Sequence, residues 1–153
     1  MVAAYANDNW SQPNLQPARE DITLSLENVT VDTFVKNLQE NITTETLDFD
    51  IQVLNGDSSQ LGKKDFKHDV NVIFYDGDND QMKMVEFFTN MLTFTQDVFT
   101  LVIDDANIEK NVEVTKQFLD YNGLKILYER ELLNDPEDAA MWWNGLYVVV
   151  VSK

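Results

Sequence analysis

The stretch VNVIFYDGD, residues 70–78, decides the fold, because it joins an apolar run typical of a buried strand to an acidic turn. A second stretch of this kind, FTLVIDD, covers residues 99–105. Between them, residues 80–93 place apolar side chains at helical spacing. Parallel strands buried on both faces form continuous apolar runs. Strand, helix and strand in this order therefore predict a parallel pair joined by a right-handed crossover.

The same alternation extends over the rest of the chain. Further strands are expected at residues 2–6, 49–54, 124–129 and 146–151, and helices at about residues 30–41, 58–66 and 112–121. Residues 22–26 suit either a short edge strand or part of a loop. No helix separates the last two strands, which favours an antiparallel hairpin at one edge. We therefore predict an α/β fold: a Rossmann-like, doubly wound, three-layer sheet, mostly parallel with an antiparallel closing strand, in one domain over residues 1–153.

The charge balance limits the partners of this chain. Lys and Arg number 11 against 27 Asp and Glu, so the formal net charge is −16. Such a surface repels phosphate backbones and anionic lipids, which predicts no nucleic-acid and no membrane partner. With 0 Cys and 1 His, thiolate chemistry and His-rich metal sites are excluded. No membrane-length apolar run and no signal-peptide pattern is present, so we expect a cytoplasmic protein.

Acidic residues follow four of the expected strands: Asp8, Asp57, Asp76, and Asp104 with Asp105. Ligands of open parallel sheets bind beyond the carboxyl ends of the strands. A carboxylate there can accept two hydrogen bonds from ribose hydroxyls, whereas several close together favour Mg²⁺, Mn²⁺ or Ca²⁺. Asp is also an ordinary turn and cap residue, so each position has a purely structural explanation as well.

These stretches resemble the class I S-adenosylmethionine-dependent methyltransferases, in particular the branch of macrocin-type and catechol-type O-methyltransferases. Residues 72–78 and 101–105 are similar to two strand ends of that branch, the second of which carries a paired acid. Residues 5–11 resemble the family's second strand and its ribose-binding acid, and residues 55–58 its adenine-side turn. Residues 142–151 resemble the reversed final strand.

The resemblance implies methyl transfer from S-adenosylmethionine to an oxygen of a small-molecule or sugar-like acceptor. Asp8, Asp57, Ser58 and Asp76 would bind the cofactor. Asp76 is also the expected catalytic residue. A Mg²⁺ or Mn²⁺ ion at Asp76, Asp104 and Asp105 would hold the acceptor oxygen and lower the pKa of its hydroxyl.

The chain departs from this family in two places. Asn79 stands where the branch has His. The family's first strand and glycine-rich turn are expected to precede Met1, with that strand lying between residues 2–6 and 70–75. Its absence would expose sheet edges, which predicts weak or absent methyl transfer and a homo-oligomer formed through those edges. Two alternatives stay open: a non-catalytic binding or subunit-pairing module, and a hydroxylase-like or sugar-modifying relative.

Overall fold

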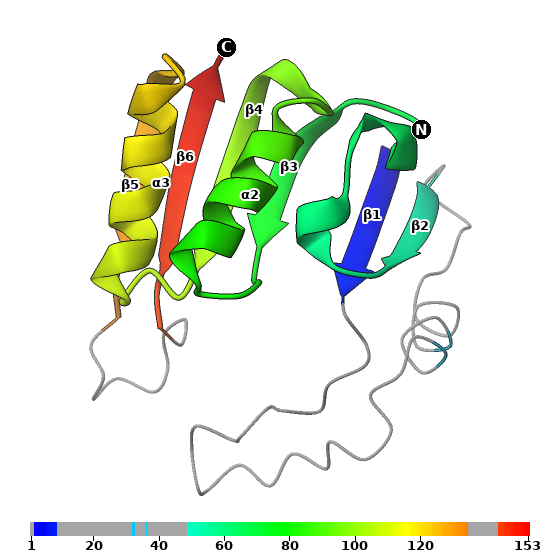
Figure 1. Ribbon diagram of the computed structural model, residues 1–153, viewed down its shortest axis with the longest axis horizontal. Coiled ribbons are helices and arrows are strands. Elements are labelled where there is room, and N and C mark those ends of the chain that lie inside the picture. The colour runs from blue at the N-terminus through cyan, green and yellow to red at the C-terminus, as the bar shows by residue number, and fades with distance from the viewer. Residues whose placement is uncertain (1, 9–31, 33–35, 37–48, 135–143) are drawn as a thin grey trace, which may run out of the picture. The chain divides into compact units, whose positions relative to one another are not determined.

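The computed structural model describes residues 2–8, 32, 36, 49–134 and 144–153 (Figure 1). The chain divides into two compact units, Met1–Ser58 and Ser59–Lys153. The predicted segment at residues 22–26 and most of the predicted helix at residues 30–41 lie outside the described residues, although Asp32 and Lys36 are helical. One domain over residues 1–153 stays a prediction.

The first unit contains two parallel strands, β1 (Val2–Asp8) and β2 (Phe49–Asn55). Both strands were predicted from short apolar runs, and both are confirmed. Their register pairs Val2 with Phe49 and Asp8 with Asn55. The carboxyl ends of the two strands therefore lie side by side, so that Asp8 and the turn after Asn55 share one edge of this sheet.

The second unit contains four strands in the order β3-β4-β6-β5. They are β3 (Val70–Tyr75), β4 (Thr95–Asp104), β5 (Lys125–Leu132) and β6 (Leu146–Ser152). The first two are parallel, whereas β6 runs antiparallel to both β4 and β5. The predicted Rossmann-like α/β sheet with an antiparallel closing strand is thus confirmed. The closing strand lies inside the sheet, and β5 forms the edge.

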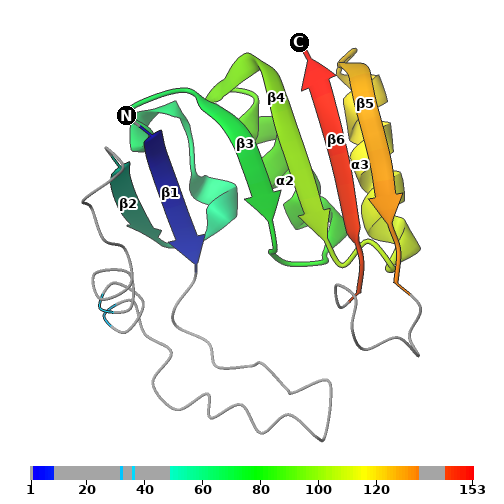
Figure 2. The same cartoon turned by 180° about the vertical axis from the view of Figure 1, so that it is seen from behind.

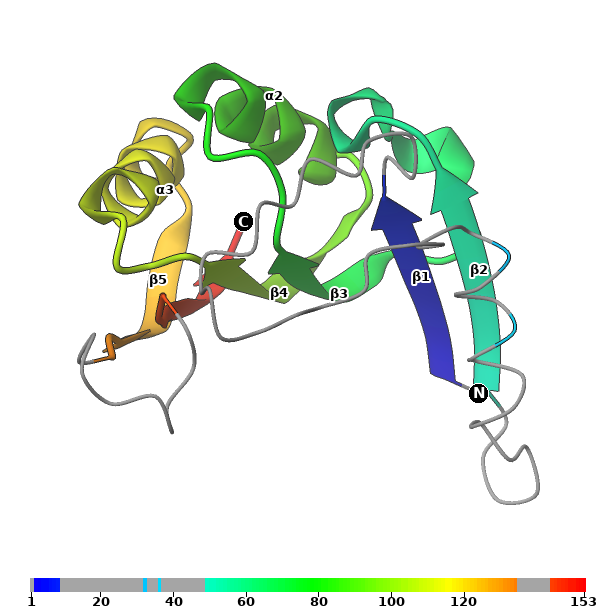
Figure 3. The same ribbon diagram turned by 90° about the horizontal axis from the view of Figure 1, so that it is seen from below.

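Two helices, α2 (Gln81–Met91) and α3 (Glu109–Tyr121), cover the same face of the four-stranded sheet (Figures 1 and 3). The strands turn alternate side chains towards them, as the period of two requires. The Phe88 ring of α2 joins the layers, with its centroid 5.7 Å from that of Tyr75 and 5.4 Å from that of Phe118. The buried hydrophobic core consists of Ile73, Tyr75, Met84, Phe87, Phe88, Met91, Phe94, Phe99, Leu101, Ile103, Ala106, Val112, Phe118, Leu119, Tyr147, Val149 and Val151.

The opposite face of this sheet, turned to the viewer in Figure 2, carries exposed apolar side chains. Val72 is 57 % exposed and Phe74 is 59 % exposed, whereas Ile73 and Tyr75 between and beside them are buried. The continuous apolar run of β3 predicted burial on both faces. Burial instead alternates along β3, because α2 and α3 both pack on the face to which Ile73 and Tyr75 point. No helix in the described part of the chain has the length and apolar character needed to span a bilayer.

The helix predicted at residues 58–66 is wrong. The structure has two short 3-10 helices there, η1 (Ser58–Gln60) and η2 (Lys63–Asp65). Gly62 separates them with an extended backbone, φ −151° and ψ 179°. The Gly62 backbone N–H donates to Asp65 Oδ2 at 2.9 Å, which fixes the start of η2. Glycine loses more conformational freedom in a helix than any other residue. Gly62 therefore favours a break between η1 and η2 over one continuous helix.

We expect Gly77→Ala to destabilise the fold by about 1–3 kcal/mol, as overpacking usually does. A Cβ at Gly77 would lie 2.7 Å from Tyr75 Cζ. That ring cannot move away easily, because it is buried and its hydroxyl is hydrogen-bonded. Gly62→Ala is the matched control, since its Cβ would meet nothing within 4 Å. Urea unfolding of both variants checks this, and equal losses would contradict the close approach at Gly77.

Candidate functional site

Two acidic turns lie at the carboxyl ends of the parallel strands β3 and β4. The last residue pair of these strands is Tyr75 with Ile103. Asp76 and Asp104 each come one residue later, so the structure brings them to neighbouring strand ends. Ligands of open α/β sheets bind at this edge.

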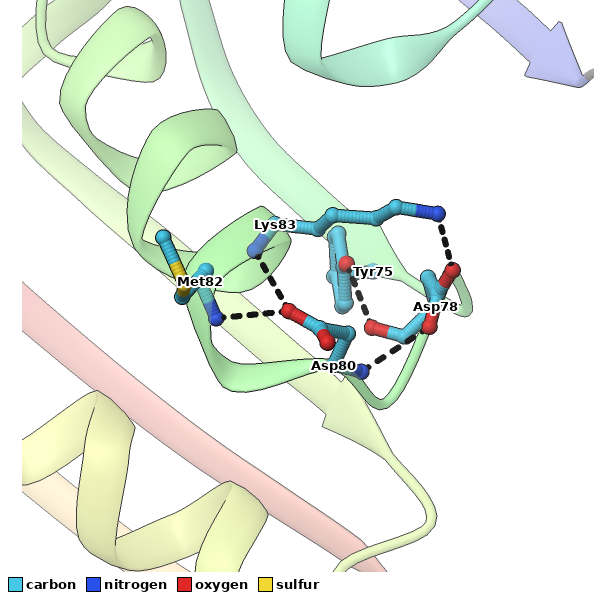
Figure 4. A network of polar contacts seen from close by, with 5 residues as sticks. All are labelled: Tyr75, Asp78, Asp80, Met82 and Lys83. Atoms are coloured by element: carbon cyan, nitrogen blue, oxygen red, sulfur yellow. Dashed lines mark hydrogen bonds and ion pairs between the residues drawn. The ribbon is translucent and has the colours of Figure 1, made fainter.

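The turn between β3 and α2 is held by its own acids (Figure 4). Asp80 is the N-cap of α2, and its Oδ1 accepts hydrogen bonds from the backbone N–H groups of Met82 at 2.9 Å and Lys83 at 3.2 Å. Asp78 pairs with Lys83 Nζ at 2.5 Å and accepts from the Asp80 N–H at 2.9 Å. These two contacts hold the pKa of Asp78 below its usual range. Asp78 and Asp80 therefore build the turn, while Asp76 is exposed beside it.

Asp105 lies at the centre of a second polar cluster. Its backbone has φ 57°, in the left-handed region. Asp105 Oδ2 accepts a hydrogen bond from Asn79 Nδ2 at 2.9 Å, and Oδ1 accepts one from Asn144 Nδ2 at 2.9 Å. Asn111 Nδ2 donates to Asn79 Oδ1 at 2.6 Å, and this asparagine is only 1 % exposed. We call Asp105, Asn79, Asn111 and Asn144 the Asp105 network.

Asn107 ties the end of β5 and the start of β6 to the same turn. Its backbone N–H donates to the Asn144 carbonyl oxygen at 2.7 Å. Its side-chain Nδ2 donates to Asn134 Oδ1 at 2.6 Å and to the Asn134 carbonyl oxygen at 3.2 Å. The chain therefore leaves β5 and enters β6 at positions fixed by the turn that follows β4.

Asp104 differs from its neighbour Asp105. It is half-buried in the last position of β4, and desolvation raises its pKa above the usual value for Asp. The Asp105 backbone N–H opposes this shift, and the Asp105 charge adds to it. A raised pKa in the folded state means that ionised Asp104 opposes folding. Its contribution is most favourable at low pH and is lost as the pH rises through the folded-state pKa.

The cation site predicted at Asp76, Asp104 and Asp105 stays a prediction. The described residues contain no group of three Asp, Glu, His or Cys side chains that could hold a metal ion. Asp105, moreover, already accepts an amide hydrogen bond at each carboxylate oxygen. Sequence reasoning missed this arrangement because it treated Asn79 only as a missing His. Asn residues occur next to several strand ends, and this pattern could have indicated that Asn side chains pair with the acidic residues there.

We expect Mg²⁺ and Mn²⁺ to give no site-specific gain in thermal stability. A cation at Asp105 would compete with the amides of Asn79 and Asn144, each of which donates to one of its carboxylate oxygens. Salt of any kind relieves repulsion in so acidic a chain, so melts are compared at equal ionic strength. Parent and Asp105→Asn should show the same small shift with millimolar Mg²⁺. A larger shift in the parent, lost in Asp105→Asn, would establish the cation site.

The predicted cofactor residues belong to both units. Asp8 ends β1, and Asp57 lies in the turn after β2, so pairing brings both to one edge. Asp57 is exposed and Ser58 is half-buried. Asp76 belongs to the second unit. A shared cofactor site of Asp8, Asp57, Ser58 and Asp76 stays a prediction.

The strand order and the acidic turns define the fold as that of Rossmann-like methyltransferases. The N-methyltransferase NodS from Bradyrhizobium japonicum WM9, in complex with S-adenosyl-L-homocysteine, is similar with a TM-score of 0.54 and 12 % identity. This match covers 99 % of the present chain and 77 % of NodS. At such an identity the likeness shows the fold alone.

Two further structures are similar at a lower level. An rRNA methylase from Streptococcus thermophilus has a TM-score of 0.48 and 11 % identity, over 97 % of this chain and 72 % of its own. Precorrin-6y C5,15-methyltransferase from Geobacter metallireducens GS-15 has a TM-score of 0.48 and 14 % identity, over 78 % of this chain and 60 % of its own. The present chain thus spans less than two thirds of that enzyme. No protein-family model and no curated protein matches the chain.

Proposed function

We propose that this chain binds S-adenosylmethionine and takes part in methyl transfer. The observation that carries the proposal is the sheet order β3-β4-β6-β5, with the antiparallel β6 between β4 and β5, together with acidic turns at the carboxyl ends of β3 and β4. A likeness to NodS with bound S-adenosyl-L-homocysteine supports the choice of ligand.

In this proposal Asp8 accepts hydrogen bonds from the ribose hydroxyls, and Asp57 with Ser58 lies against the adenine. Asp76 adjoins the cofactor and orients the acceptor. S-adenosylmethionine supplies an activated methyl group on its sulfonium. The acceptor oxygen would take this methyl group, the carbon–sulfur bond would break to leave S-adenosylhomocysteine, and the exposed Asp76 carboxylate would accept the hydroxyl proton. An acceptor oxygen held in line with the carbon–sulfur bond would lower the barrier, because the reacting atoms would already be positioned for transfer.

The finer form of the proposal is an oxygen acceptor on a small or sugar-like molecule. A groove of about 680 Å³ beside the β4–α3 turn, whose lining does not include Asp76, has room for a molecule of that size. The groove is lined partly by Glu109, Glu113 and Glu131, with Lys116 as its cation. Lys116 already pairs with Glu131 at 2.8 Å. An uncharged or cationic acceptor suits such a lining better than a phosphorylated one. The absence of nucleic-acid and membrane partners, and a homo-oligomer formed through sheet edges, remain predictions.

A cation-assisted reaction is the second form of this proposal. In that form Mg²⁺ or Mn²⁺ would be held by Asp76, Asp104 and Asp105, as in the O-methyltransferase branch that the sequence resembles. We favour the form without a cation, because both carboxylate oxygens of Asp105 accept amide hydrogen bonds. The alternative from another class is a non-catalytic binding or subunit-pairing module, which would retain the fold without turnover.

Thermal melts with different nucleotides test the proposed ligand. A ligand that binds only the folded chain stabilises it by about 2.7 kcal/mol at a concentration of about 100 Kd. S-adenosylmethionine and S-adenosylhomocysteine should raise the melting temperature, whereas ATP and NAD, with their phosphates, should not. Stabilisation by ATP or NAD alone would instead indicate a different Rossmann-type ligand.

A further inference from the structure

The side of the four-stranded sheet opposite α2 and α3 is apolar at positions where a solvent-facing sheet is normally polar (Figure 2). Along β3 the outward positions hold Val72 and Phe74, which are 57 % and 59 % exposed. Along β6 they hold two half-buried valines that alternate with buried residues. We call this side the open face, and its apolar residues are Val72, Phe74, Val102, Tyr128, Val148 and Val150.

Strand pairing arranges the open face in two rows that cross the whole sheet. Residues directly opposite each other in neighbouring strands point to the same side of the sheet. The register of the four strands gives a first row of Val72, Thr100, Val150 and Tyr128. It gives a second row of Phe74, Val102, Val148 and Arg130. Each row therefore begins at one border of the sheet, in β3, and ends at the other border, in β5.

The open face differs in charge from the chain as a whole. On the described strands, the register places three charged residues on it, Asp104, Lys125 and Arg130. Glu129 and Glu131 point to the other side, where both pair with a lysine of α3. Two cations against one acid give the open face a formal charge of +1, whereas the chain carries −16. Repulsion between two copies of this chain is therefore weakest where their open faces meet.

A twofold axis can bury the full width of two such faces. Stacked sheets lie about 10 Å apart, so their side chains interdigitate. An axis parallel to the strands, between β4 and β6, places β3 of one copy over β5 of the other and keeps each row opposite the same row. Phe74 then faces Arg130 of the second copy, and Val72 faces Tyr128 of the second copy. Twofold symmetry makes each contact twice, and a guanidinium over an aromatic ring is a favourable cation–π pair.

We propose that this chain forms a face-to-face homodimer through the open face, in which Phe74 of each copy packs against Arg130 of the other. From the usual strand spacing and rise, the open face has a footprint of roughly 400 Å². This is less than the area of about 800 Å² that each partner buries in a standard interface. The dimer is therefore weak and dissociates at the low chain concentrations of an unfolding experiment. The contact differs from pairing through sheet edges, which joins backbone groups and does not use these side chains.

Analytical ultracentrifugation of the full chain over a wide concentration range tests the proposal. We expect a monomer–dimer equilibrium that shifts towards the dimer as added salt screens the repulsion between the two acidic copies. Phe74→Lys should weaken the association about tenfold or more, because it sets a lysine against Arg130 of the second copy. Met82→Lys is the matched control, since Met82 is 83 % exposed in α2, away from the open face, and the change in net charge is the same.

A charge exchange distinguishes the proposed pairing from a general effect of charge on the open face. Phe74→Glu, which offers Arg130 of the second copy an opposite charge, should retain the dimer. Adding Arg130→Glu to Phe74→Lys should restore the association that Phe74→Lys weakens. A failure to restore it would overturn the pairing of Phe74 with Arg130.

Two results for the association itself would overturn the proposal. One is a parent chain that stays monomeric at every concentration, as it would if another part of the chain or a different protein occupied the open face. The other is a dimer that Phe74→Lys and Met82→Lys leave equally strong, as pairing through sheet edges would produce.

Discussion

Phe88→Ala is expected to lower the free energy of unfolding by about 3–5 kcal/mol, the usual cost of removing a buried aromatic ring. Phe88 is fully buried, and its ring contacts those of Tyr75, Phe87 and Phe118. Those rings come from β3, α2 and α3, so the cavity would open where both helices meet the sheet. Urea unfolding followed by circular dichroism measures the loss.

Phe74→Ala is the matched control for this truncation. Phe74 lies one residue from Tyr75 in the same strand but is 59 % exposed on the opposite face. Its loss should change the free energy of unfolding by no more than about 0.5 kcal/mol, as for most surface substitutions. Equal losses in Phe74→Ala and Phe88→Ala would contradict the finding that only the face of the sheet covered by α2 and α3 is buried.

Asp8→Ala should weaken the binding of S-adenosylhomocysteine by about 1.5–3 kcal/mol, as for hydrogen bonds to a charged group. A carboxylate at the end of β1 can accept from two ribose hydroxyls at once, and such paired, charge-assisted bonds are strong. Isothermal titration of parent and variant measures the difference in affinity.

Asp57→Ala provides the comparison within the same unit. The adenine edge offers a carboxylate one hydrogen bond, so this variant should lose less affinity than Asp8→Ala. Asp57 is exposed, and its replacement should leave the fold intact. A greater loss in Asp57→Ala would show that the two turns have been assigned to the wrong parts of the cofactor.

Local sequence was sufficient to predict the position of β3, although not its burial on one face only. Residues 70–75 form β3 with the predicted boundaries, since the apolar run stops at Asp76-Gly77. The helix predicted over residues 80–93 is α2 (Gln81–Met91), with Asp80 as its N-cap rather than its first residue. The inner place of β6 was not predictable, because an antiparallel hairpin has the same local sequence whichever of its strands pairs with β4.

The role of Asp105 could not be predicted for a different reason. Two adjacent acids after a strand suggest a shared cation, and nothing local distinguishes Asp104 from Asp105. In the fold, Asp104 is the last residue of β4, whereas Asp105 turns into a left-handed conformation. Only that turn brings the Asp105 carboxylate to Asn79 and Asn144, which come from other segments. The partners are set by tertiary structure.

Binding of S-adenosylhomocysteine to the parent chain is the most direct test of the proposed function. Isothermal titration calorimetry in buffered physiological salt, without divalent cations, gives affinity and stoichiometry together. We expect saturable binding in the micromolar range with one ligand per chain, weakened in Asp8→Ala. An absence of binding heat at several temperatures, from a chain whose circular dichroism and cooperative melt show an intact fold, would contradict the account.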